Sequence, residues 1–207
     1  MHRRSIRSIS IRFLTLVVPF LLFSSGGKAQ HTKFSDSILA IIEAMPNDTA
    51  KASYINEIYY NELWAFNLPE AYNALKLAAR ICREQHADTL LYRTYRSMGS
   101  FCVRANANDY AMQNTKSALE LAIAMNDSVK IGSCWSAMAA SFSSLGEHEL
   151  SIAYYQKALP LIAKSGNIET IGRVHTFIGW AYDGVGQLDS AIRYCEMGLR
   201  EREAANY

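Results

Sequence analysis

Residues 126–165 read NDSVKIGSCWSAMAASFSSLGEHELSIAYYQKALPLIAKS, and residues 166–205 read GNIETIGRVHTFIGWAYDGVGQLDSAIRYCEMGLREREAA. These two adjacent stretches have the same length and agree at several columns, which predicts a repeated structural unit. The agreement extends back to residues 86–125. The matching columns are Gly99, Ala139 and Gly179; Asn106, Gly146 and Gly186; Ala118, Ala158 and Gly198; and Leu119, Leu159 and Leu199.

A further step back by the same period reaches Ala71 and Ala78, so a divergent first copy is expected. The sequence therefore predicts four copies, at about 51–85, 86–125, 126–165 and 166–207. Within a copy the small and apolar positions step by four, three, one and three, as the buried face of a helix does. Each copy is expected to form two helices. The stepping residues are Leu91, Tyr95, Met98, Gly99 and Cys102 in one helix, and Ala111, Thr115, Ala118, Leu119 and Ala122 in the next.

Turn residues recur at fixed places between the expected helices. Glycine and asparagine adopt left-handed backbone geometry at the lowest cost, so Asn106, Gly146 and Gly186 are expected to turn the chain within a copy. His86, Asn126 and Gly166 occupy the corresponding column between copies. Asp88, Asp127 and Asn167 follow them and are predicted to cap the next helices. The predicted fold class is all-α, a right-handed solenoid of antiparallel helix pairs.

These columns resemble the tetratricopeptide repeat (TPR), whose consensus combines a bulky residue, a small residue, an aromatic, a turn glycine and two alanines. The third copy matches at Trp135, Met138, Ala139, Phe142, Gly146, Ser151, Tyr155 and Ala158; the fourth matches at His175, Ile178, Gly179, Tyr182, Gly186, Ala191, Cys195 and Gly198. The period of 40 resembles a longer-helix variant of the family. The resemblance implies non-catalytic binding of a protein or peptide along a concave surface.

The resemblance also places a groove on the first helix of each copy. The residues that it assigns to that surface, three arginines and one acid among them, are Ser53, Asn56, Tyr60 and Leu63; Arg93, Arg96, Ser100 and Val103; Ser133, Ser136, Ala140 and Ser143; and Arg173, Thr176, Trp180 and Asp183. The three arginines suggest an acidic partner, because a guanidinium holds a carboxylate through two parallel hydrogen bonds. No nucleic acid is expected as a partner.

The N-terminal region has the three parts of a secretory signal peptide. Four arginines lie at residues 3–12, the apolar run FLTLVVPFLLF spans 13–23, and small residues lead to a cleavage site before Gln30. Residues 1–29 are therefore predicted to be removed, which leaves an N-terminal helix and linker at 30–50. The mature chain is expected in the periplasm or outside the cell, without membrane insertion. The net charge of +2 depends on five basic residues before position 30, and the rest of the chain is net acidic.

The sequence offers no complete motif for catalysis or metal binding. His148 and Glu149 begin like a zinc-protease helix, but Ile152 stands where the second histidine would be needed. The chain is accordingly expected to be neither an enzyme nor a cofactor or metal protein. His31, His86, His148 and His175 are expected at surfaces or turns. Cys82, Cys102, Cys134 and Cys195 fall on apolar helix positions and are expected to be small buried hydrophobes.

Two functions remain open from the sequence. The first is an exported TPR scaffold that binds a protein or peptide. The second is the extracytoplasmic sensory region of a longer TPR-containing histidine kinase or transcriptional regulator, to which the exported repeat region is similar. In either case the apolar stripe of the last expected helix, which includes Leu188, Ile192 and Leu199, should be partly exposed.

Overall fold

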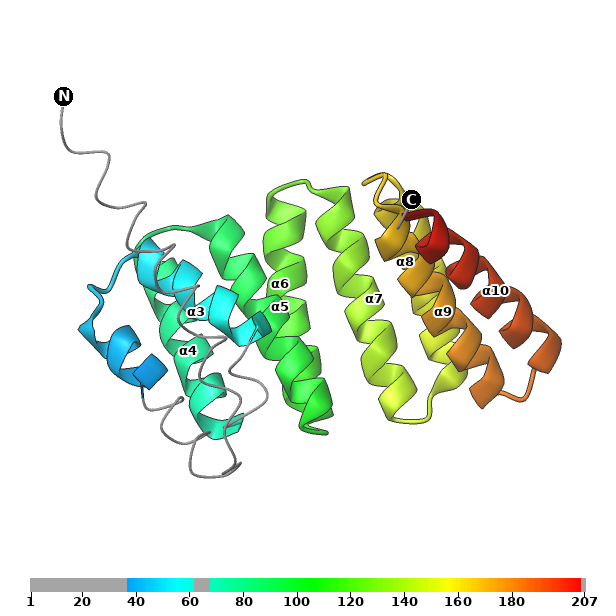
Figure 1. The fold of residues 1–207 in the computed structure, drawn as a ribbon, viewed down its shortest axis with the longest axis horizontal. Helices are drawn as coiled ribbons and strands as arrows, with labels where there is room; N and C mark the ends of the chain where they lie inside the picture. Colours follow the sequence, from blue (N-terminus) through cyan, green and yellow to red (C-terminus); the bar gives the residue numbers. More distant parts are fainter. Residues whose placement is uncertain (1–36, 62–67, 206–207) are drawn as a thin grey trace, which may run out of the picture. The chain divides into compact units, whose positions relative to one another are not determined.

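A computed structural model describes residues 37–61 and 68–205, with the side chains of 59–61 and 68 left undescribed. The predicted signal peptide, residues 1–29, lies outside the described residues. The chain divides into two compact units, 1–41 and 42–207. Residues 37–41 of the first unit are helical. The second unit contains α3 (Thr49–Asn61), α4 (Leu68–Glu84), α5 (Asp88–Arg104), α6 (Asn108–Ala124), α7 (Ser128–Ser144), α8 (His148–Ala163), α9 (Ile168–Gly184) and α10 (Leu188–Ala205) (Figure 1).

Consecutive helices of the second unit pack against each other as antiparallel neighbours (Figure 1). The described part of this unit consists of helices and turns without any strand. The helix pairs α5–α6, α7–α8 and α9–α10 begin at Asp88, Ser128 and Ile168. Because the paired helices have nearly equal lengths and short turns, each pair stacks beside the previous one.

The turns have the backbone geometry that the sequence predicts. Asn106, Gly146 and Gly186 have φ values of 56°, 79° and 77°. His86, Asn126 and Gly166 also have positive φ, between 51° and 66°. These left-handed residues come after the helix ends, where the chain must reverse, so the predicted turn positions are confirmed.

Two of the three predicted N-caps are confirmed. The Asp127 side chain accepts a hydrogen bond from the Lys130 backbone N–H at 3.0 Å, and Asn167 accepts one from the Thr170 N–H at 2.8 Å. The third prediction is wrong, because Asp88 is already the first residue of α5 and Ala87 precedes it without any side-chain cap. Asp88 instead adds a negative charge to the first turn, where the helix dipole favours it.

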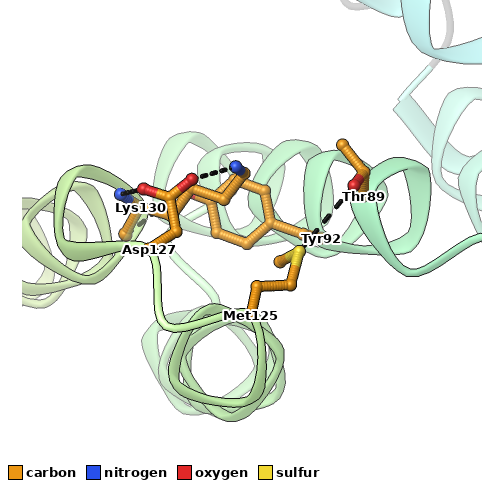
Figure 2. A network of polar contacts seen from close by, with 5 residues as sticks. All are labelled: Thr89, Tyr92, Met125, Asp127 and Lys130. Atoms are coloured by element: carbon orange, nitrogen blue, oxygen red, sulfur yellow. Dashed lines mark hydrogen bonds and ion pairs between the residues drawn. The ribbon is translucent and has the colours of Figure 1, made fainter.

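Figure 2 shows how the α7 cap is tied to α5. The Lys130 ammonium pairs with Asp127 and lies 5.8 Å from the centre of the Tyr92 ring. The Tyr92 hydroxyl donates to the Lys130 carbonyl at 3.3 Å, and Thr89 donates to the Met125 sulfur at 3.7 Å. Hydrogen bonds from the Lys130 side chain and backbone lower the pKa of Asp127. This network links two successive helix pairs at one end of α5.

The core lies between the stacked pairs. One cluster joins α7, α8 and α9, and another joins α5, α6 and α7. The small residues Ala118 and Ala158 of the predicted repeat column are fully buried. The buried residues are Ala139, Tyr155, Ala158, Ile162, Val174 and Ile178 in the first cluster, and Tyr92, Ala118, Ala122 and Cys134 in the second.

The cysteines are unpaired thiols, three of them buried as expected and one, Cys195, only half-buried. Burial raises the pKa of Cys82, Cys102 and Cys134, which keeps these thiols protonated. The expectation for His175 is wrong. Its ring is buried between α9 and α10, and its Nδ1 lies 2.6 Å from the Glu201 carboxylate.

Candidate functional site

The first helices of successive pairs, α5, α7 and α9, are neighbours in the stack. Small side chains face one another between α5 and α7, namely Gly99 and Ser100 on one side and Ser136, Ala137 and Ala140 on the other. Because these residues do not fill the space, a hollow of about 310 Å³ remains. The larger residues that complete its lining are Arg96, Val103, Arg104, Thr115, Tyr155 and Phe177.

The floor of the hollow comes from the second helices. Thr115 of α6 and Tyr155 of α8 line it, and each is only 2% exposed. The Tyr155 hydroxyl makes no hydrogen bond to any described residue, yet its oxygen is not completely enclosed by protein. Burial raises the pKa of this hydroxyl, so it stays protonated and remains a hydrogen-bond donor.

The charged residues of the lining are both basic. Arg96 is half-buried and Arg104 is exposed, and no aspartate or glutamate lines the hollow. Among the described residues no carboxylate lies within ion-pair distance of Arg96. Burial raises the pKa of Tyr92 and of Cys134, and the nearby positive charge of Arg96 partly offsets that rise. The hollow is therefore lined mainly by small and apolar side chains, its charged residues are basic, and Phe177 adds an aromatic ring.

A row of aromatic rings leads from the hollow along α9. Tyr155 stacks on Phe177 with ring centres 5.9 Å apart, and Phe177 is followed by Trp180 at 5.4 Å. Trp180 is 60% exposed. It also lines a second hollow, of about 270 Å³, between α9 and α10, together with Leu188 and Ile192.

The second hollow lies beside the exposed apolar stripe that the sequence predicts. Leu188, Ile192 and Leu199 are 59%, 60% and 57% exposed, which confirms the expectation for this helix. Internal copies cover the same columns, since Ile152 and Leu159 are half-buried at the positions of Ile192 and Leu199.

The structure separates the predicted groove residues. Arg96 lines the first hollow together with the predicted Ser100, Val103, Ser136 and Ala140, whereas Arg93 and Arg173 are exposed outside it. The Arg173 guanidinium lies 3.5 Å from the Thr170 hydroxyl. The side chain of Tyr60 lies outside the described residues.

Asn56 requires a correction, because it is fully buried rather than exposed in a groove. Its amide nitrogen donates to the Ala52 carbonyl at 2.9 Å and to the Thr94 hydroxyl at 2.8 Å, and its oxygen accepts from Ser97 at 3.3 Å. Thr94 and Ser97 are also completely buried. Asn56 thus joins α3 to α5 and has no polar atom left for a ligand.

Six residues that line the hollow were not predicted as site residues: Gly99, Arg104, Thr115, Ala137, Tyr155 and Phe177. Thr115 and Tyr155 occupy one column of the repeat, and the periodicity identified both as packing positions. Arg104 lies two helical turns after Arg96 and therefore on the same face of the helix, so a search for basic residues on that face identifies it from the sequence.

Two further observations concern metals and membranes. Within the described ranges, no three histidine, cysteine, aspartate or glutamate side chains are grouped closely enough to hold a metal ion. None of the helices that the structure describes has the length and apolarity needed to cross a bilayer.

Comparison with known proteins gives a fold but no family assignment. No protein-family model and no curated protein matches the sequence. Among solved structures, a Rap protein complexed with Competence and Sporulation Factor has a TM-score of 0.68 at 16% identity, over 86% of this chain and 53% of that one. Aspartyl phosphate phosphatase F from Bacillus subtilis has a TM-score of 0.66 at 16% identity, over 78% and 43%.

A MamA protein is closer to this chain in length. Its TM-score is 0.56 at 24% identity, over 87% of this chain and 89% of that one. The chain spans about half the length of the other two structures. These likenesses confirm the predicted fold class, an all-α solenoid built from antiparallel helix pairs.

Proposed function

We propose that this protein is a non-catalytic binding scaffold that holds a segment of another protein, or a peptide, across α5, α7 and α9. The observation that carries the proposal is the hollow between α5 and α7, which combines small side chains, basic residues and the aromatic side chains of Tyr155 and Phe177. A preformed concave site with few, well-placed polar groups is typical of ligand binding. The likeness to a Rap protein solved with a bound factor supports the same function.

The proposed partner is acidic. Arg93, Arg96 and Arg173 are all on first helices and are half-buried or exposed, so each guanidinium is available to a partner that contacts this face. Charge complementarity of this kind increases association rates and makes binding sensitive to salt.

Reversing two of these charges should weaken capture of the partner. In a pull-down from the extracytoplasmic fraction of the native host, the double variant Arg93→Glu and Arg96→Glu is expected to bind at least tenfold more weakly than the unmodified protein, about 1.4 kcal/mol. The measurement is the amount of partner captured at increasing salt.

The matched control for that experiment reverses two exposed charges on second helices, Arg80 and Lys116, and gives the same change in net charge. This control should capture the partner as the unmodified protein does. Equal capture by all three proteins would show that the arginines of α5 are an ordinary solvated surface.

The location of the scaffold is also a proposal, supported by the basic and apolar composition of residues 1–29. The mature protein purified from its native host should begin at or near Gln30, which N-terminal sequencing or intact-mass measurement checks. Recovery of the chain with Met1 in place would overturn export with cleavage.

The second candidate function is the sensory region of a longer histidine kinase or regulator. The exposed Leu188, Ile192 and Leu199 favour it, because an additional element of the same protein would bury these side chains. The coding sequence downstream of Tyr207 decides between the two candidates. An apolar segment of about 20 residues followed by a kinase-like domain would establish the sensory one.

A further inference from the structure

The outer face of α10 carries a regular row of apolar side chains. Among the described helices α9 is the main neighbour of α10, which lies at the end of the stack (Figure 1). The row consists of the exposed Leu188, Ile192 and Leu199 and the half-buried Cys195. Its steps of four, three and four residues place all four side chains on one stripe, as in a helix that pairs with another helix. The row also borders the hollow of about 270 Å³ beside Trp180, which leaves room for incoming apolar side chains.

The row is complementary to itself when a second copy of α10 runs antiparallel to the first. A two-fold axis between Arg193 and Tyr194 places Leu188 opposite Leu199 of the second copy. The same axis places Ile192 opposite Cys195 of the second copy. Each contact occurs twice, so every residue of the row is covered, with the smaller Cys195 beside the branched Ile192 near the axis.

The charges beside the row are complementary in the same arrangement. They alternate in sign along the exposed side of α10, at Asp189, Arg193, Glu196 and Arg200. The antiparallel pair brings Arg193 near Glu196 of the second copy, and Arg200 near Asp189 of the second copy. The arginine side chains lean toward the N-terminus of their own helix, which brings them closer to these carboxylates. An in-register parallel pair would instead place each charge beside its own copy.

We propose that the α10 face formed by this row and these four charges is a dimer interface, in which α10 of two copies pairs antiparallel about a two-fold axis. Such an interface is closed, so association stops at the dimer. A contact made by one helix from each copy buries less than about 1,200 Å², which makes the dimer weak and its dissociation constant micromolar rather than nanomolar. The proposal is independent of the function proposed for the hollow between α5 and α7.

The first test is the mass of the protein in solution. The full chain is expressed in its native host and studied by sedimentation equilibrium across the micromolar range, with a reductant that keeps Cys195 free. We expect a monomer–dimer equilibrium. Ile192→Glu should weaken it at least tenfold, because the change buries a charge in an apolar contact. Ile123→Glu is the matched control, since Ile123 on α6 is 59% exposed and Ile192 is 60% exposed, and it should dimerise as the unmodified protein does.

The ion pairs provide a second test, which is specific for antiparallel geometry. Arg193→Glu and Glu196→Arg each bring like charges together in both halves of the dimer, so each variant alone should dimerise about tenfold more weakly at low salt. An equal mixture of the two variants restores opposite charges in both halves and should dimerise as the unmodified protein does. Two misfolded chains would not recover in this way.

The matched control for the charge exchange lies on α4. Arg80 and Glu84 are both 60% exposed and form an ion pair within that helix, as Glu196 and Arg200 do within α10. Arg80→Glu and Glu84→Arg make the same chemical changes away from the α10 face. These variants should dimerise as the unmodified protein does, both alone and mixed.

Three results would overturn the proposal. A protein that stays monomeric across the series would leave the α10 face to a different protein or to another element of the same chain. Dimerisation that Ile192→Glu does not weaken would show that another surface is responsible. Weakened Arg193→Glu and Glu196→Arg variants whose mixture fails to recover would exclude the antiparallel pairing. None of these results affects the pull-down with Arg93 and Arg96, because those residues lie on α5.

Discussion

Replacing Gly198 by alanine is expected to destabilise the protein by about 3 kcal/mol, at the upper end of the range for overpacking. A Cβ atom at this position would lie 2.5 Å from the Gly172 carbonyl oxygen and would also collide with the Thr176 hydroxyl. Gly172 makes the contact reciprocal, since its own Cβ would lie 2.9 Å from the Gly198 carbonyl. Because these atoms are mostly backbone, α9 and α10 must move apart to make room.

The direction of the stability change in Gly198→Ala tests the close contact between the two helices. At an open helix position, glycine to alanine stabilises by about 1 kcal/mol, so the close crossing has to reverse an intrinsic preference. Urea denaturation of the Gly198→Ala variant measures the result, with Glu203→Ala on the exposed face of the same helix as the control that should change little. A variant as stable as the unmodified protein would show that the two helices cross with space between them.

The second large effect is expected from Asn56→Asp, which places a carboxylate inside the buried network of α3 and α5. The amide nitrogen that donates to Ala52 and Thr94 would be replaced by an oxygen facing the Ala52 carbonyl and a Thr94 hydroxyl that already donates to Leu90. An unpaired buried charge destabilises a protein by about 3–5 kcal/mol. We expect a loss of this size at pH 7.

The pH dependence separates charge from simple loss of contacts. Burial raises the folded-state pKa of the new carboxyl above its unfolded value of about 3.9, so the folded variant keeps its proton longer than the unfolded chain. Its stability is therefore greatest below about pH 4 and is lost as the pH rises from there toward the folded pKa. Asn56→Ala, measured by denaturation at the same pH values, is the control. A destabilisation of Asn56→Asp relative to this control that is the same at pH 4 and pH 7 would contradict the burial of the network.

The same network marks where sequence reasoning reaches its limit. The repeat period predicts the helices and the left-handed turns because these depend on local residue types, such as Gly146 and Gly186, at fixed spacing. In the sequence pattern, a polar residue on a first helix looks the same whether its side chain faces a ligand or a neighbouring helix. The partners that settle the question for Asn56, namely Thr94 and Ser97, lie 38 and 41 residues away.

The candidate site shows a related limit. Arg96 could be predicted from its place on the helix face, but the hollow beside it arises from what is missing, the bulk that Gly99 and Ala140 do not supply. Tyr155 carried a clear signal as a packing aromatic, and its ring does pack. Only the three-dimensional arrangement reveals that its hydroxyl has no partner among the described residues.

The left-handed residues stand at positions 86, 106, 126, 146, 166 and 186, in equal steps of half the repeat period. Each step carries the chain once along the length of a helix, so removing a single step would reverse the direction of every later helix. It would also place the second helix of each later pair where the first helix belongs. Removing or duplicating two steps restores both direction and face. The stack of helices can accordingly lengthen or shorten only in whole units of one helix pair. The smallest insertion or deletion in the gene that preserves the fold is therefore one full repeat period.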